Sequence, residues 1–74
     1  MNQLDKQGYY LSELGNLIVY YGLGANEYHP DMYYYEVYKK MCNDRPEQWN
    51  AILTTEKTLD ILNKTLEFEY LGEL

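Results

Sequence analysis

Few side chains in this chain could act as a nucleophile or its base: one cysteine, Cys42, one histidine, His29, and the serine Ser12. A catalytic cysteine usually needs a positive neighbour or a helix N-terminus that stabilises its thiolate. We expect Cys42 at the C-terminal end of a helix, where the helix dipole disfavours a thiolate. A lone cysteine in that position is typical of a small, partly buried hydrophobic side chain. We therefore predict no catalytic residue.

A metal site would have to use Glu27, His29 and Asp31, which alternate along one segment and could offer two oxygens and a nitrogen. The spacing is not specific to metal sites, and Asp31 also suits the start of a helix. One cysteine and one histidine are too few for a structural zinc site. Gly22 and Gly24 lack the third glycine and the lysine of a phosphate-binding loop. We predict neither a metal nor a cofactor.

Carboxylate pairs such as Glu67 and Glu69 could in principle serve general acid and base catalysis. A small-molecule site normally needs a pocket of about 300 Å³ or more. A chain of 74 residues forms one small domain, and we expect it to be too small to enclose such a pocket. The sequence therefore predicts a single acidic domain, residues 1–74, that is not an enzyme.

The charge of the chain argues against nucleic acid as a direct partner. Twelve acidic and six basic residues give a net charge of −6, and such a field repels phosphates and anionic lipid. No window approaches the roughly 18 consecutive apolar residues of a membrane span. The N-terminus lacks the charged-then-apolar pattern of a secretory signal. We predict a cytoplasmic protein that does not bind membranes.

Tyrosine is the residue whose distribution says most about function. Nine of the ten tyrosines lie between Gln7 and Tyr38, a stretch without lysine or arginine. Protein interfaces are enriched in tyrosine and depleted of lysine, because tyrosine adds a large apolar ring with a polar tip at a low entropic cost. The stretch therefore indicates a contact surface.

The elements that would position these residues are predicted as helices. From Leu4 to Tyr21 the apolar residues recur at helical spacing, and Gly22 supplies a stop. The run Leu17 to Tyr21 is also compatible with a strand. A second helix is expected to begin at Pro30 and to run to about Cys42, burying Tyr34 and Tyr38.

A third helix is expected to start near Pro46, and either Thr54 or Thr55 could cap a fresh helix after it. The last segment has two interpretations. Its apolar stripe can continue as a helix to Leu71, or the helix can end near Lys64, because residues 66–70 alternate with period two as a half-buried strand does. The fold class that we predict is all-α, a small three- or four-helix bundle. The alternative is an α+β fold with a C-terminal strand at about 65–71.

Two functions fit this interpretation. In the first, an acidic, tyrosine-rich face docks on a basic surface of a nucleic-acid-handling protein and competes with nucleic acid, in the manner of small phage-type inhibitors of host defence. The residues that we expect to bind the partner are Tyr9, Glu13, Tyr20, Glu27, Tyr28, Asp31, Tyr33, Tyr35 and Glu36.

The second function is a homo-oligomeric structural or adaptor protein, in the simplest case a homodimer. Here the tyrosines fill the core and a self-interface, and the charge only keeps the assembly soluble. We expect Tyr21, Tyr34 and Tyr38 in the core under either hypothesis. Salt separates the two, because docking driven by charge weakens as ionic strength rises.

Overall fold

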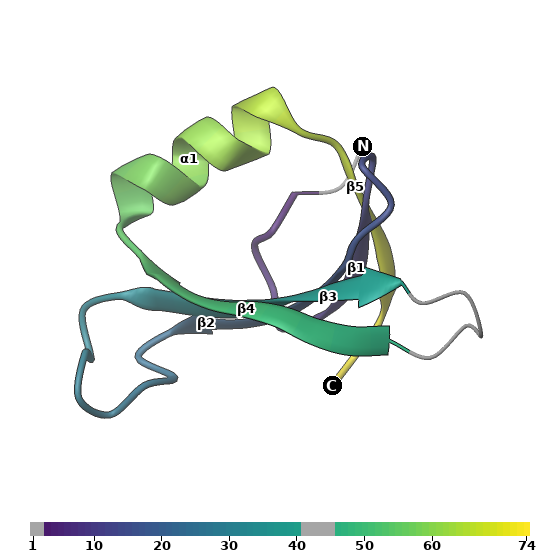
Figure 1. The fold of residues 1–74 in the computed structure, drawn as a ribbon. Coiled ribbons are helices and arrows are strands. Elements are labelled where there is room, and N and C mark those ends of the chain that lie inside the picture. The colour runs from purple at the N-terminus through teal and green to yellow at the C-terminus, as the bar shows by residue number, and fades with distance from the viewer. Residues whose placement is uncertain (1–2, 41–45) are drawn as a thin grey trace.

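The computed structural model describes residues 3–40 and 46–74, and in these it shows one antiparallel sheet and one helix. The sheet has the strand order β4-β3-β2-β1-β5. Helix α1 lies across one face of the curved sheet, and the N-terminal segment lies between the two (Figure 1). The elements in chain order are β1 (Gly8–Ser12), β2 (Leu17–Leu23), β3 (Tyr33–Lys40), β4 (Pro46–Thr54), α1 (Glu56–Thr65) and β5 (Phe68–Gly72).

The prediction of an all-α bundle is therefore wrong. The expected helix from Leu4 to Tyr21 is a hairpin of β1 and β2. The expected second and third helices are β3 and β4, which pair with each other, while Cys42 lies outside the described residues. Strands form here because aromatic and β-branched residues pack well on a pleated sheet.

The C-terminal segment follows the alternative interpretation. Helix α1 begins after Thr55, whose side-chain oxygen accepts a hydrogen bond from the Thr58 N–H at 3.2 Å. It ends at Thr65, and β5 follows instead of further helical turns. Strand β5 pairs with β1, so the last strand of the sheet lies beside the first.

Strand β1 shows why helical spacing misled the prediction. Its burial alternates with period two, with Tyr10 and Ser12 buried and Tyr9 and Leu11 exposed. Its hydrophobicity does not alternate, because the exposed side also carries large apolar groups and the buried side includes a serine. Sequence patterns detect a strand when one face is polar, and here both faces are largely apolar.

The core lies between the sheet and α1. Tyr10 is its centre at 1% exposure, and its ring meets those of Tyr20 and Tyr70 edge to face. Its hydroxyl donates to the Lys6 carbonyl at 2.7 Å, so its polar tip is satisfied. The buried core residues are Leu4, Tyr10, Ile18, Tyr20, Tyr35, Val37, Leu59 and Phe68.

A candidate protein-binding face

The face of the sheet opposite α1, which we call the open face, carries most of the remaining tyrosines. Cross-strand partners point to the same side of a sheet, and one row of partners crosses four strands: Tyr9, Val19, Glu36 and Ala51. The strand alternation assigns the rest of the face. The residues of the face whose side chains the structure describes are Tyr9, Leu11, Leu17, Val19, Tyr21, Tyr34, Glu36, Tyr38, Ala51, Leu53, Glu69 and Leu71.

Glu36 organises the centre of the open face. Its Oε1 accepts hydrogen bonds from the hydroxyls of Tyr21 at 3.0 Å and Tyr38 at 2.9 Å. Its Oε2 accepts one from the Tyr34 hydroxyl at 3.0 Å. The rings of Tyr21 and Tyr34 are stacked, with centroids 5.2 Å apart. We call Glu36, Tyr21, Tyr34 and Tyr38 the Glu36 cluster.

The tyrosines of the Glu36 cluster stay protonated far above neutral pH. Burial, reinforced by the hydrogen bond to Glu36, raises the pKa of Tyr21 to about 12. The same causes raise the pKa of Tyr34. For Tyr38 the hydrogen bond to Glu36 is the largest cause of a raised pKa, and burial adds to it. Each hydroxyl therefore remains a hydrogen-bond donor that is aimed at the carboxylate.

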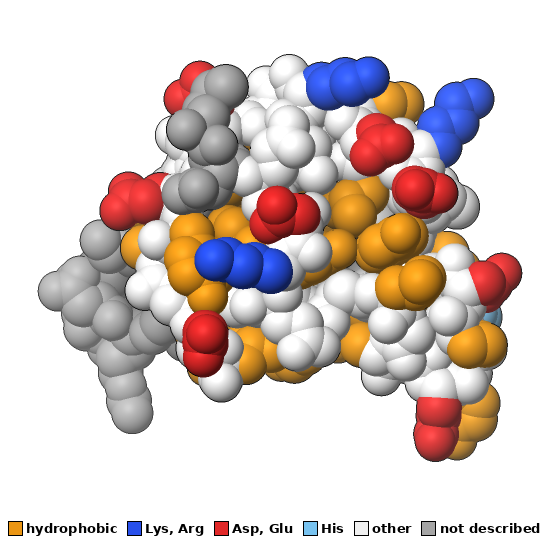
Figure 2. Space-filling view, turned by 180° about the vertical axis from the view of Figure 1, so that it is seen from behind, with side chains coloured by type: hydrophobic (Ala, Val, Ile, Leu, Met, Phe, Trp, Pro, Cys, Tyr) orange, Lys and Arg blue, Asp and Glu red, His pale blue; other side chains and the backbone are white. Residues whose placement is uncertain are grey.

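The open face is apolar around this cluster. Tyr9 is 39% exposed, Leu11 38% and Leu71 50%, while Val19 is buried. Among the residues of the face whose side chains the structure describes, only Glu36 and Glu69 carry a charge. Exposed apolar surface of this kind commonly marks a site of protein contact. Figure 2 shows the molecule from behind, with α1 above and the sheet below, and hydrophobic side chains reach the surface there among acidic and basic ones.

The structure disperses the nine predicted partner-binding residues. Tyr9 and Glu36 lie on the open face, whereas Tyr20 and Tyr35 are core residues at 2% and 8% exposure. Tyr33 packs against the core from the same side. The nine residues therefore do not form one surface, because alternate residues of a strand point to opposite faces of the sheet.

Four of the predicted residues are in loops. Glu13 is in the turn between β1 and β2, and Asp31 is in the loop between β2 and β3. Glu27 and Tyr28 line an open hollow with Tyr34, so they border the open face at one end. A partner on the open face would thus meet four of the nine: Tyr9, Glu27, Tyr28 and Glu36. Whether any of the nine binds a partner stays a prediction.

Three residues of the site were assigned differently from sequence. Tyr21, Tyr34 and Tyr38 were expected in the core, and they are half-buried on the open face instead. The alternation of Tyr34, Glu36 and Tyr38 along one strand was the signal that places them together.

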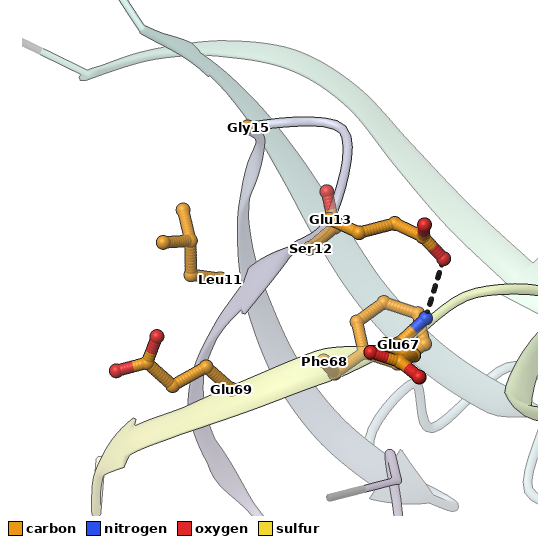
Figure 3. A pocket seen from close by; sticks show the side chains of 7 residues that line it. All are labelled: Leu11, Ser12, Glu13, Gly15, Glu67, Phe68 and Glu69. Atoms are coloured by element: carbon orange, nitrogen blue, oxygen red, sulfur yellow. Dashed lines mark hydrogen bonds between the residues drawn. The ribbon is translucent and has the colours of Figure 1, made fainter. Parts of the chain in front are cut away.

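A second hollow, of about 620 Å³, lies between the β1–β2 turn and β5 (Figure 3). The Glu13 carboxylate reaches across it and accepts a hydrogen bond from the Glu67 N–H at 2.8 Å, which ties the turn to β5. The carboxylates of Glu67 and Glu69 extend away from each other in this view. They do not form the close pair that acid and base catalysis would use.

Other candidate sites are not assembled in the described part of the chain. No three histidine, cysteine or acidic side chains within residues 3–40 and 46–74 gather in a way that could hold a metal ion, and this includes Glu27, His29 and Asp31. Within the same residues, α1 is too short and too polar to cross a membrane. Comparison with protein families, curated proteins and solved structures found no match to this chain.

Proposed function

We propose that this chain is a non-enzymatic protein-binding module that self-associates through its open face. The observation that carries the proposal is the division of the tyrosines: all except Tyr28 lie either in or against the core or on the open face. This is the distribution that a homo-oligomer needs, with one set of rings for folding and a second set for contact.

The composition of the open face favours a second copy as partner. Most of the face is apolar, so two copies that pack face to face remove apolar surface from water. The charge of −6 on each chain opposes this contact, but most of that charge lies off the face. Salt at physiological strength screens such charges beyond about 8 Å. A cytoplasmic location and a structural or adaptor role belong to the same proposal.

The inhibitor hypothesis takes second place. It needs acidic groups among the exposed tyrosines, and Glu13 and Asp31 lie outside the open face while Glu27 lies only at its border. Charge-driven docking on a nucleic-acid-handling protein would use Glu36 alone at the centre of the face.

Analytical ultracentrifugation over a range of concentrations tests the proposal. Replacing Leu11 and Leu71 together by glutamine makes the open face more polar without changing its charge, and we expect self-association to weaken at least about tenfold. The matched control replaces Leu14 and Ile61, which are exposed away from this face, by glutamine. A chain that is monomeric at every concentration, or equal weakening by both variants, would refute the proposal.

A further inference from the structure

We propose that the Glu36 cluster is a binding site for a guanidinium group, supplied by an arginine side chain of a partner protein. The inference deepens the proposed function and rests on it in one respect, that the open face is a contact surface. It adds the chemistry that the centre of this surface recognises.

The hydrogen-bonding groups of the Glu36 cluster suit a ligand that only donates. An ionised carboxylate offers about four lone-pair positions, and three tyrosine hydroxyls fill three of them at Glu36. Each of these hydroxyls donates its only hydrogen to the carboxylate, so the cluster offers a ligand nothing but the lone pairs of its oxygen atoms. The cluster is therefore rich in acceptors and has no free donor. A fitting ligand has several donors and no acceptor, and the guanidinium group has five donors.

The charge around Glu36 favours a cationic ligand. The cross-strand neighbours of Glu36 are Val19 and Ala51, which are both uncharged. Among the residues of the open face whose side chains the structure describes, none is a lysine or an arginine. The net charge of −6 adds an attractive field for a basic partner.

Aromatic rings surround the Glu36 carboxylate. Tyr21 and Tyr34 form a stacked pair beside the carboxylate. Tyr9 lies in the same cross-strand row as Glu36, with Val19 between them, which places a fourth ring at the border. Arginine stacks on aromatic rings and is weakly hydrated, whereas a lysine ammonium is a compact, strongly hydrated charge. The cluster thus selects arginine over lysine.

A second copy of the chain does not satisfy this site. It would bring an identical cluster of acceptors, and two such clusters in contact leave both Glu36 carboxylates buried without a counter-charge, which is costly. Self-association through the open face must therefore gain enough free energy from apolar contacts to offset the cost of burying the two Glu36 clusters. An arginine-bearing partner satisfies the same centre and displaces the second copy.

The test is calorimetric titration of the full chain with an acetylated and amidated tetra-arginine peptide. Tetra-citrulline is the neutral control of the same shape, and tetra-lysine is the control of the same charge. We expect binding in the order arginine, lysine, citrulline. Glu36→Gln should weaken the arginine complex about tenfold, the loss of one charge-assisted contact. Asp60→Asn, which removes one charge from the exposed side of α1, should weaken it less than about twofold.

Equal weakening by Glu36→Gln and Asp60→Asn would overturn the inference, because it would show attraction to net charge alone. Equal binding of tetra-arginine and tetra-citrulline would overturn it as well. If Glu36→Gln fails to fold, the double variant Tyr21→Phe with Tyr34→Phe takes its place in the test. These changes keep the rings and remove two acceptor oxygens. Unchanged arginine binding in this variant would refute the site. Ultracentrifugation of the same samples separates the two proposals. A monomer that binds arginine contradicts self-association only, and an oligomer indifferent to arginine contradicts this site only.

Discussion

Asn63 holds both backbone groups of Leu4, a residue 59 positions away in the chain. The Leu4 N–H donates to Asn63 Oδ1 at 2.8 Å, and Asn63 Nδ2 donates to the Leu4 carbonyl at 3.3 Å. The two bonds dock the N-terminal segment against α1 and keep the Leu4 side chain in the core at 1% exposure. One amide on the helix thus fixes a segment that has no regular secondary structure of its own.

Asn63→Ala should lower the free energy of unfolding by about 1–3 kcal/mol, because two partly buried backbone groups lose their partner. Urea denaturation followed by circular dichroism measures the change. Asn26→Ala is the control, since the Asn26 side chain accepts a single hydrogen bond in an exposed loop. Equal costs for the two variants would contradict the role assigned to Asn63.

The protein should lose stability in alkaline solution through its buried tyrosines. Burial is the largest cause that raises the pKa of both Tyr20 and Tyr21 from 10.0 to about 12. A raised pKa in the folded state means that these phenols contribute stability fully below pH 10 and lose it as pH rises toward 12. Urea denaturation at a series of pH values should show this fall. Tyr20→Phe should make the fall smaller, and an unchanged pH profile in that variant would contradict the assignment.

Tyr38 and Tyr35 provide a paired test of the Glu36 cluster. Hydrogen bonding to Glu36 is the first cause of the raised pKa of Tyr38, whereas the pKa of Tyr35 is raised by burial alone. Glu36→Gln should therefore lower the pKa of Tyr38 and leave the pKa of Tyr35 unchanged. Carbon-13 NMR of the tyrosine rings across the alkaline range reports both. A parallel fall in the two values would show that the substitution loosens the whole fold.

Alanine substitutions at Gly8 and Gly15 compare the cost of a steric clash with the cost of backbone strain. A Cβ on Gly8 would lie 2.5 Å from the Gly72 carbonyl oxygen and 2.5 Å from Tyr70 Cε1. Gly8→Ala should therefore push β5 away from β1 and cost about 3 kcal/mol in unfolding free energy. Gly15 has φ +89° with open space around its Cβ position, so Gly15→Ala should cost only about 1 kcal/mol of strain. Thermal or urea denaturation of both variants checks the order, and the reverse order would contradict it.

The sequence predicted the helical part of this fold better than its sheet. A threonine cap at Thr55 and the helical spacing of Leu59 and Leu62 are local features of the sequence. In the structure Thr55 caps α1, and Leu59 and Leu62 pack in or against the core. The period-two pattern of residues 66–70 likewise became β5, because only that strand alternates apolar and acidic residues.

The other strands could not be recognised by alternation. Leu11, Tyr21 and Tyr34 are large apolar residues on a face that no polar pattern marks. A helix template then matched the apolar spacing of these segments as well as a strand template did. Tyr9 and Glu36 were nonetheless predicted contact residues and do lie on the open face, since the tyrosine-rich composition of the stretch does not depend on its secondary structure.

The position of β5 beside β1 determines the order in which the chain can assemble. Strands β1 to β4 follow one another as neighbours, so they can pair through short loop closures as soon as each is made. Strand β5 must pair with the first strand of the chain, and we expect this long-range pairing to be the slow step. Until it arrives, the outer backbone groups of β1 are unpaired and the Tyr10 ring lacks its neighbour Tyr70. A half-synthesised chain therefore exposes an unpaired strand edge on which other nascent chains can aggregate, and the pairing of β5 covers this edge.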